Sequence, residues 1–594
     1  MTTATSATPT LGGGQWLLKA IDPAAVFTPA QLTDEHRLIG QTVTDFITGE
    51  VSPLLDRLEQ KDWTLARDLV RRAGALGLLG VDVAEAHGGV QLDKTTSMIV
   101  SERMSRSASF GATFGAHVNL MILPLVLFGS EAQKRKYLPP LLSGQMIGAY
   151  CLSEPGSGSD ALGARTRAER QTDGSFVLSG EKMWITNGGF ADVFIVFAKV
   201  GGEHFSAFIV ERAFAGVTSG KEEHKMGLHG SSTTPVILQD VRVPAENLIG
   251  EIGRGHKIAF NVLNFARFKL GAMCEGGAKI GIGESARYAA ERRQFGQPIA
   301  AFGAIKHKLG EMIVRTYAVE SLMYRTAGMI DARIAATPHD PADQAVALAT
   351  LEEYAVEASI AKVAGSETLD YVLDENIQIH GGNGYVRDYP AERHYRDSRV
   401  NRIFEGTNEI NRLLIPGMLA RRATKGELAL IPAAKALQEE LTGPPAIGTD
   451  VTTVLAEEHR AVEGFKKAVL LVLGLAMQTY RERLSDQQEV LMHSADMLID
   501  TYSADSAVLR ASAASATAAA DSALQVDAAR VFVNDAGMRI DASAKQALAA
   551  MLEGDTLRTT TSALRRLFKT MPINTAAIRR VIADKAVAQG GYIF

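Results

Sequence analysis

Apolar and polar residues follow two different periods along the chain, which divide it into helical and β-rich parts. Over residues 31–148 the apolar positions recur at helical spacing, as in LIGQTVTDFI and LARDLVRRAGALGLLG. Residues 149–252 contain short β-rich runs such as VFIVFAKV and VILQDVRV, separated by turns rich in Gly and Asp. Long helical patterns return over residues 253–424. This order predicts a helical domain, a small antiparallel β barrel or sandwich, and a second helical domain.

The two ends of the chain have a different texture. Residues 1–30 show no helical or strand period and are expected to form a loosely ordered lead-in. A linker is predicted at 425–452, where Pro444 and Gly448 stand among the residues that interrupt a helix. Residues 453–594 are alanine-rich with helical spacing, which predicts an additional helical domain.

Length and composition exclude several classes of protein. A chain of 594 residues is too long for one hydrophobic core, so three or four domains are expected. With 46% hydrophobic residues, 22% charged residues and a net charge of −5, the chain has no global basic field for holding nucleic acid or an acidic membrane. Cys151 and Cys274 match no zinc or redox spacing, which favours a reducing compartment and no metal site.

Two segments bear on localisation. The first ten residues, MTTATSATPT, lack the basic and apolar regions of a secretory signal and the arginines of a mitochondrial presequence. We therefore expect a cytoplasmic protein. The longest unbroken apolar run, Ala468–Met477, has about half the length needed to span a bilayer, which predicts a buried helix. An interfacial helix is the alternative, and peripheral membrane contact near the linker and Lys466-Lys467 stays open.

Two motifs in the β-rich part could hold a flat or anionic group. YCLSEPGSGSD, residues 150–160, gathers glycines and serines in one turn, so that backbone N–H groups and hydroxyls can face a phosphate, a carbonyl oxygen or a flavin edge. In KMWITNGG, Trp184 and Thr186 are two residues apart and would share one face of a strand. An indole there could stack on a cofactor; a plain loop and a core tryptophan are the structural alternatives.

Two further motifs place donors on helices. In LNFARFKLG, Asn264 and Arg267 share a helix face, where the arginine could meet a phosphate or an adenine, or be solvated. In ERRQFGQPI, Arg292 and Gln294 are donors beside Phe295 at a helix end and would suit a pyrophosphate, including that of a neighbouring subunit. The chain has no phosphate-binding loop of the Walker type and no dinucleotide-binding glycine fingerprint.

The segment QIHGGNGY to RIFEGTNEI holds the strongest candidate for chemistry. HGGNG packs three glycines into five residues, which allows a backbone or a cofactor to approach closely. Glu405 follows an apolar pair and precedes a Gly-Thr-Asn turn. Such an acid could begin a helix, or it could be a base that points into a dry pocket.

Together these motifs resemble the acyl-CoA dehydrogenase family over residues 35–420. CLSEPGSGSD with MWITNGG, and QIHGGNGY with RDSRVNRIFEGTNEINRL, are the two signature stretches, in family order and at family-like separations. QFGQPIAAFGAIKHKLGEM, DYPAERHYRD and the extra C-terminal domain are most similar to the very-long-chain subgroup. The resemblance implies a mainly α fold: an N-terminal α domain, a central β barrel, a C-terminal four-helix bundle and an additional α-helical domain.

The resemblance also implies site residues, matched position by position. Glu405 matches the catalytic base, and FAD would lie between the β domain and the bundle, with several contacts made across a dimer interface. Positions that match contacts to FAD are Leu152, Ser153, Gly158, Ser159, Trp184, Thr186, Arg292, Phe295, Gln378, Gly381, Gly382, Thr407 and Glu409. Positions that match contacts to acyl-CoA are Ser159, Asn264, Arg267 and Gly406.

The implied reaction is α,β-dehydrogenation of an acyl-CoA to a trans-2-enoyl-CoA. Glu405 would remove the α-proton, the β-hydrogen would leave as hydride to flavin N5, and electrons would pass to an electron-transfer flavoprotein. A homodimer is expected. An acyl-CoA oxidase that uses oxygen and a scaffold or assembly protein that retains the fold are the alternatives. In SFGATFGAHVNL, Gly111 and Gly115 would leave either a deep channel for long acyl chains or a close helix contact.

Three positions depart from the family pattern. Some members place the base just before the matching arginine, where this chain has Ala266, which leaves Glu405 as the sole candidate. His229 stands where relatives usually have Arg or Lys. Glu409 stands where some relatives have Gln, and an acid there would need a donor beside the FAD phosphates or hydroxyls.

Overall fold

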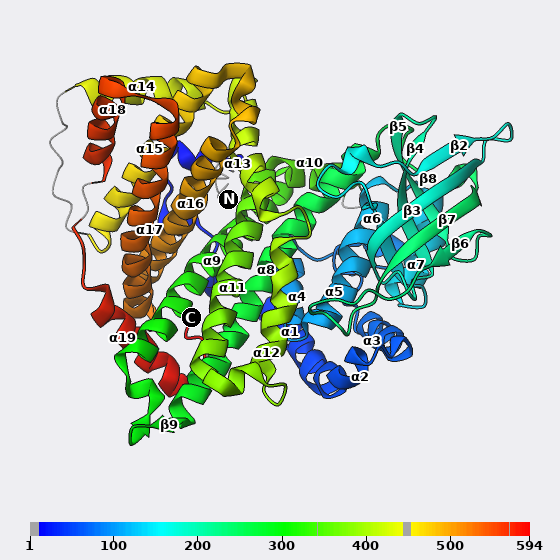
Figure 1. Ribbon diagram of the computed structural model, residues 1–594, viewed down its shortest axis with the longest axis horizontal. Helices are drawn as coiled ribbons and strands as arrows, with labels where there is room; N and C mark the ends of the chain where they lie inside the picture. Colours follow the sequence, from blue (N-terminus) through cyan, green and yellow to red (C-terminus); the bar gives the residue numbers. More distant parts are fainter. Residues whose placement is uncertain (1–10, 341–342, 444–452, 569–570) are drawn as a thin grey trace, which may run out of the picture.

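The computed structural model describes residues 11–340, 343–443, 453–568 and 571–594, and it is mainly helical with one β domain. Figure 1 shows the β domain at one end of the molecule, the additional C-terminal helices at the other, and a helical bundle between them. Residues 1–10 of the expected lead-in and 444–452 of the expected linker lie outside the described residues.

The N-terminal domain is built from short helices with side-chain caps. Thr33, Asp62, Asp93, Ser107 and Ser130 each accept a hydrogen bond from a backbone N–H of the first helical turn. Among the described helices, the run Ala108–Phe128 is the one with the length and apolar character to cross a membrane, and 78% of that window is buried inside the protein. The helices are α1 (Asp34–Phe46), α2 (Leu55–Glu59), α3 (Trp63–Ala75), α4 (Lys94–Met104), α5 (Ala108–His117), α6 (Leu123–Phe128) and α7 (Glu131–Leu142).

The β domain is one mixed sheet with the order β6-β7-β3-β2-β4-β5-β8. The strands are β1 (Gly148–Cys151), β2 (Arg167–Arg170), β3 (Phe176–Thr186), β4 (Val193–Val200), β5 (His204–Glu211), β6 (Val217–Ser219), β7 (Thr233–Val243) and β8 (Leu248–Ile249). The prediction of a purely antiparallel sheet was wrong, because β1 and β2 both pair with β4 in parallel.

Strand β4 joins two hydrophobic cores. Phe194 and Val196 point into the core of the β domain, whereas Ile195 and Phe197 pack in the core that contains the N-terminal helices. Successive side chains of a strand point to opposite faces, so a strand buried on both sides reads as an unbroken apolar run, as VFIVFA does.

The bundle brings two long helices into close contact. A Cβ on Gly271 of α8 would lie 2.8 Å from the carbonyl oxygen of Ala361, and a Cβ on Gly365 of α11 would lie 2.9 Å from that of Gly271. Glycine at both positions therefore lets the two backbones approach. The helices of this part are α8 (Gly255–Glu291), α9 (Gly303–Ala336), α10 (Ala345–Glu353), α11 (Ala355–His380), α12 (Pro390–Ser398) and α13 (Asn408–Thr424), and a short hairpin of β9 (Arg293–Gln294) and β10 (Gln297–Pro298) joins α8 to α9.

The additional helices pack on the bundle through buried ion pairs. Arg325 of α9 bonds to Asp505 of α16, and Arg579 of α19 bonds to Glu311 of α9. The run Ala468–Met477 is mostly buried, which confirms the prediction of a buried helix. These helices are α15 (Ala456–Tyr480), α16 (Gln488–Ala516), α17 (Ser522–Met551), α18 (Gly554–Leu567) and α19 (Thr575–Gln589).

The segments that we predicted to be a loosely ordered lead-in and a linker are ordered where the structure describes them. Helix α14 (Leu430–Thr442) occupies much of the expected linker and packs on α15. The described part of the lead-in is anchored, because Glu357 accepts hydrogen bonds from the Gly14 N–H (2.7 Å) and from Nε1–H of Trp16 (3.1 Å), whose side chain is fully buried. Both segments owe their order to tertiary contacts that their own sequences do not show.

Candidate active site

Glu405 lies in a sharp turn between α12 and α13. Glu405 and Gly406 both have left-handed backbone conformations, with φ of 56° and 79°. A non-glycine residue in that region is strained and persists only where its surroundings hold it. Thr407 then begins α13 by accepting a hydrogen bond from the Ile410 N–H at 3.2 Å. Glu405 therefore lies in the turn before α13 and is not part of the first helical turn.

Two buried cations hold this turn through its carbonyl groups. Arg267 of α8 donates Nε–H to the carbonyl oxygen of Glu405 at 2.9 Å, and Lys362 of α11 donates from Nζ to that of Gly406 at 2.9 Å. Asn411 also donates to the Gly406 carbonyl, at 2.8 Å. Because Arg267 and Lys362 lie near the close approach of α8 and α11, the helix packing fixes where the turn sits.

The predicted substrate residues Asn264 and Arg267 lie together beside this turn. Arg267 Nη1 donates to Asn264 Oδ1 at 3.0 Å, and the arginine is only 5% exposed, so it is not a solvated side chain. Sequence reasoning missed Lys362, which is fully buried and also donates to Asn408 at 2.6 Å. A lysine among small and apolar residues in SIAKVAGS was the signal that could have marked it.

The electrostatics of the turn suit a general base. Burial raises the pKa of the Glu405 carboxyl to about 7, against the opposing effect of Arg267 and Lys362. Burial lowers the pKa of Lys362 to about 8. The hydroxyl of Tyr150 is buried and has no hydrogen-bond partner among the described residues, and both burial and the Glu405 charge raise its pKa. A carboxylate with a pKa near neutrality can take a proton from a weak carbon acid.

The Gly/Ser loop and the tryptophan strand meet on the β domain. The Met183 N–H donates to the Ser153 carbonyl at 2.9 Å, which places Ser153 beside Trp184. A register shift between Lys182 and Ile185 and a φ of 57° at Trp184 turn the indole outward, so that it is 60% exposed rather than part of the core. The regular strand that we assumed at Trp184 is therefore interrupted by a bulge at this residue.

The loop itself is held by an acid that the motif analysis did not single out. Glu154 is buried and accepts hydrogen bonds from the Thr166 N–H at 3.1 Å and from Lys182 Nζ at 2.7 Å. Gly158 and Ser159, at the tip of the loop, are exposed, and a Cβ on Gly158 would meet nothing within 4 Å. The loop therefore presents backbone and hydroxyl groups on a rigid base.

A second group of predicted cofactor residues lies far from Glu405. Arg292 follows Arg267 by 25 residues along α8, so the two are about 37 Å apart at the rise of an α-helix. Phe295 is 92% exposed in the β9–β10 hairpin. Gly381 and Gly382 lie at the same end of the bundle, because Tyr288 of α8 donates to the carbonyl of His380 at 3.2 Å. One chain does not bring Arg292, Phe295 and the glycine pair to Glu405.

Other predicted residues fall between these groups. Leu152 and Thr186 are partly buried beside the loop, and Gln378 precedes the Gly381-Gly382 pair near the end of α11. Glu409 is exposed in the first turn of α13. The FAD and substrate contacts of these residues remain predictions.

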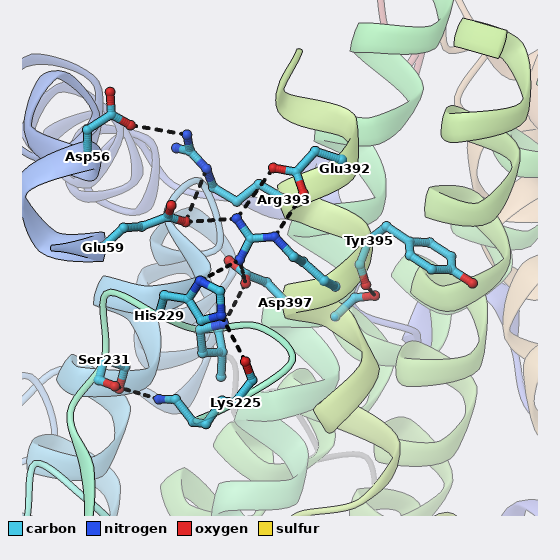
Figure 2. Close-up of polar contacts among 12 residues, drawn as sticks. Asp56, Glu59, Lys225, His229, Ser231, Glu392, Arg393, Tyr395 and Asp397 are labelled. Atoms are coloured by element: carbon cyan, nitrogen blue, oxygen red, sulfur yellow. Dashed lines mark hydrogen bonds and ion pairs between the residues drawn. The ribbon is translucent and has the colours of Figure 1, made fainter. Parts of the chain in front are cut away.

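His229 lies where three domains meet (Figure 2). Arg396 of α12 donates to Nδ1 of His229 at 3.2 Å and to Glu59, the last residue of α2, at 3.1 Å. Nε2 of His229 lies 2.9 Å from the carbonyl oxygen of Lys225, which can only accept, so the hydrogen bonds fit the tautomer with the proton on Nε2. His229, which differs from the family pattern, therefore lies beside the positive charge of Arg396 at this junction.

Comparisons with known families match the domain pattern. The descriptions that match are "Acyl-CoA dehydrogenase, N-terminal domain" at residues 33–145, "middle domain" at 149–241, and "C-terminal domain" at 253–419 and, by a second model, at 464–566.

Similar proteins extend over nearly the whole chain. A "Probable acyl-CoA dehydrogenase" of Bacillus subtilis (strain 168) is 48% identical, covering 96% of both chains. A crystal structure of an acyl-CoA dehydrogenase complexed with FAD from Bacillus anthracis is 48% identical with a TM-score of 0.96, covering 98% of this chain and all of that one. A very long-chain specific acyl-CoA dehydrogenase of Macaca fascicularis is 39% identical over 65% of this chain and 60% of that protein. This chain belongs to the acyl-CoA dehydrogenase family.

Proposed function

We propose that this protein uses FAD to dehydrogenate an acyl-CoA between its α and β carbons, with Glu405 as the base. The observation that supports the proposal most directly is the Glu405 carboxyl, whose pKa burial raises to about 7 in a turn held by Arg267 and Lys362. A structural acid at a helix start would be solvated or paired, whereas no cation among the described residues forms an ion pair with this carboxylate.

The residues on the β domain fit FAD. Trp184 offers a free aromatic face beside the Ser153 loop, and the open space around Gly158 lets a planar ring approach the backbone. The similar Bacillus anthracis protein was crystallised with FAD. FAD, when bound, supplies the acceptor for a hydride, which is the redox half of the reaction.

The chain's own groups would remove the α-proton and donate a hydrogen bond to the thioester oxygen. The Glu405 carboxylate takes the α-proton, while the two electrons of the β C–H bond leave with that hydrogen, so that a C=C bond forms. Among the described residues nothing accepts a hydrogen bond from the Glu405 N–H, which leaves this donor for the thioester carbonyl. A donor aimed at that oxygen stabilises the negative charge that develops as the proton departs.

Two copies would share the cofactor contacts in this proposal. Arg292, Phe295 and the Gly381-Gly382 pair are exposed at the end of the bundle away from Glu405, too far to reach FAD beside Trp184 of the same chain. Exposed aromatic and bare backbone groups at one end suit the FAD tail of a partner copy. We therefore propose a homodimer that passes its electrons to an electron-transfer flavoprotein in the cytoplasm.

Two glycines of α5 bear on the length of the acyl chain. A Cβ on Gly111 would lie 2.9 Å from Met273 of α8, so this glycine serves close helix packing. Gly115 has only Asn119 near its Cβ position, at 3.6 Å, and could face an acyl channel. We keep long chains as the proposed substrates, and similar proteins named both short-chain and very long-chain specific show that the test must cover both.

The test is reduction of the purified, FAD-loaded protein by saturated acyl-CoAs of increasing length without oxygen. We expect loss of the flavin absorbance band in the wild type, retained FAD but no bleaching in Glu405→Gln, and normal bleaching in Glu427→Gln, which alters an exposed acid after α13. Normal bleaching by Glu405→Gln would refute the assignment of the base. Rapid peroxide formation in air would favour the oxidase instead of the dehydrogenase.

A further inference from the structure

A large cavity lies between the domains, away from Glu405. Its volume is about 1020 Å³, and its walls come from the segment after Asp22, the end of α4, the second half of α8, the end of α16 and the residues around Tyr592. Arg287 of its α8 wall is 20 residues beyond Arg267, or about 30 Å along the helix. A smaller cavity of about 300 Å³ shares several of the same residues.

The floor of the cavity is a buried set of charges that balance one another. Lys279 contacts Glu102 at 2.8 Å and Glu320 at 2.6 Å, and Arg510 also donates to Glu320, at 2.5 Å. Burial raises the pKa of Glu275, the remaining acid beside Lys279, to about 8, so that it is mostly uncharged at neutral pH. The floor therefore contributes little net charge.

The rim, by contrast, has an excess of positive charge. Arg37, Arg103, Arg106 and Arg287 all line the larger cavity. In the described part of the chain no carboxylate pairs with Arg37, Arg106 or Arg287, and Arg103 has only Glu102 at 3.8 Å. Partial burial and the charges of Arg103 and Arg287 lower the pKa of Arg106, against the opposing effect of Glu102, and all three arginines line the same cavity. Asp22 and Asp521 also line the cavity, but among the described residues neither forms an ion pair with these arginines, so the arginines favour an anion between them.

Part of the remaining wall is apolar and aromatic. Val26, Pro29, Ile280 and Phe594 line the cavity, as does Tyr324, whose hydroxyl bonds to Glu102 and so leaves its ring for packing. Sites for organic ligands combine such walls with a few convergent polar groups, and this volume is at the upper end of their usual range.

We propose that this cavity binds an organic phosphate of nucleotide size, with its phosphates on Arg103, Arg106 and Arg287 and its ring against the apolar wall. Guanidinium groups bond to phosphate oxygens in pairs and keep their charge at any physiological pH. The site is separate from the proposed dehydrogenase site and does not depend on that function. Because its walls come from the N-terminal segment, the bundle and the additional helices, a bound ligand would join parts of the chain that are distant in sequence.

The test is calorimetric titration of the FAD-loaded protein with ADP, and separately with inorganic pyrophosphate. We expect one ADP per chain and at least tenfold weaker binding in Arg106→Gln and in Arg287→Gln, because each removes a charged donor to phosphate. Pyrophosphate should bind at least tenfold more weakly than ADP, because it lacks the ring. Arg558→Gln, which alters an exposed arginine of α18, is the matched control and should bind like the wild type.

Several results would overturn the proposal. If ADP at about 1 mM does not bind, the proposal is refuted, because a dissociation constant above about 1 mM is too weak for a specific site. ADP binding that survives both cavity substitutions would place the nucleotide elsewhere, for example where the nucleotide end of acyl-CoA binds. Equal weakening in Arg558→Gln would indicate nonspecific attraction, and equal affinity for pyrophosphate would remove the role of the apolar wall. The Arg106 side chain is exposed and forms no hydrogen bond or ion pair with the described residues, so its replacement should leave the melting temperature unchanged.

Discussion

Replacing Lys362 with methionine should shift the pH dependence of the reaction upward. The lysine is fully buried, and its charge is one of the two that lower the pKa of Glu405. Methionine has a similar length and no charge, so the substitution removes the electrostatic effect with little change in volume. The pKa of Glu405 should rise above its value of about 7, and less of the base will be ionised at neutral pH.

The size of the shift follows from the charge that is removed. Lys362 forms no ion pair with the Glu405 carboxylate, so we assume a separation of roughly 7 Å, at which two unit charges interact with about 2 kcal/mol at an effective dielectric constant of about 20. Contact of the Glu405 side chain with solvent reduces this to about 1.4 kcal/mol, which corresponds to a pKa change of about 1. The ionised fraction at pH 7 would fall from about one half to about one tenth, so kcat/KM should fall about fivefold there and recover at high pH.

The assay is kcat/KM measured from about pH 6 to about pH 9.5, where the acidic limb reports the base in the free enzyme. The Gly406 carbonyl keeps its bond to Asn411, so the turn should stay in place when Lys362 is lost. Lys466→Met, which removes a buried charge from α15, is the control and should leave the limb unmoved. A limb that stays in place or moves down in Lys362→Met, or a loss of activity that high pH does not restore, would refute the electrostatic argument.

Two further predictions concern stability. Burial lowers the pKa of His117 to about 4, below its unfolded value of about 6.5. The unfolded chain therefore binds the extra proton first, and stability should fall by about 2 kcal/mol between pH 7 and pH 5; His117→Asn should melt with a shallower pH dependence, and an unchanged slope would contradict this. Gly310→Ala would place a Cβ 2.6 Å from Arg579 of α19 and should lower stability by about 1–3 kcal/mol in thermal unfolding. Gly417→Ala has open space and should be neutral or stabilising, so equal losses in the two variants would count against the contact.

Local periodicity was enough to predict the order of helical and β domains, because the helices and strands bury faces that their own residues define. Local periodicity did not predict the order of segments that are held by contacts with residues distant in the sequence. Trp16 reads as part of an aperiodic lead-in, yet it is fixed by Glu357, 341 residues away. Helix α14 was predicted as part of a linker because prolines and glycines follow it in the sequence. The parallel pairing of β1 and β2 with β4 likewise depends on chain crossings that alternation does not encode.

At the site, the motifs identified the acid but not what holds it. Glu405 stands in a specific stretch of sequence, whereas Lys362 acts on the carbonyl of Gly406 and leaves no motif of its own. Trp184 was predicted on a regular strand, but the bulge before Ile185 sets its direction. Such residues depend on backbone geometry, which spacing rules assume to be regular.

The way the cations meet the turn explains how Glu405 can remain a base. If Arg267 or Lys362 formed an ion pair with the carboxylate itself, its pKa would fall below the ordinary value and its basicity would be lost. Both cations instead donate to the carbonyl groups of Glu405 and Gly406, which hold the strained turn in place. Burial raises the pKa of the carboxylate, and the two charges lower it only through longer-range effects, so that the pKa is about 7. The same two residues thus fix the position of the base without neutralising its function.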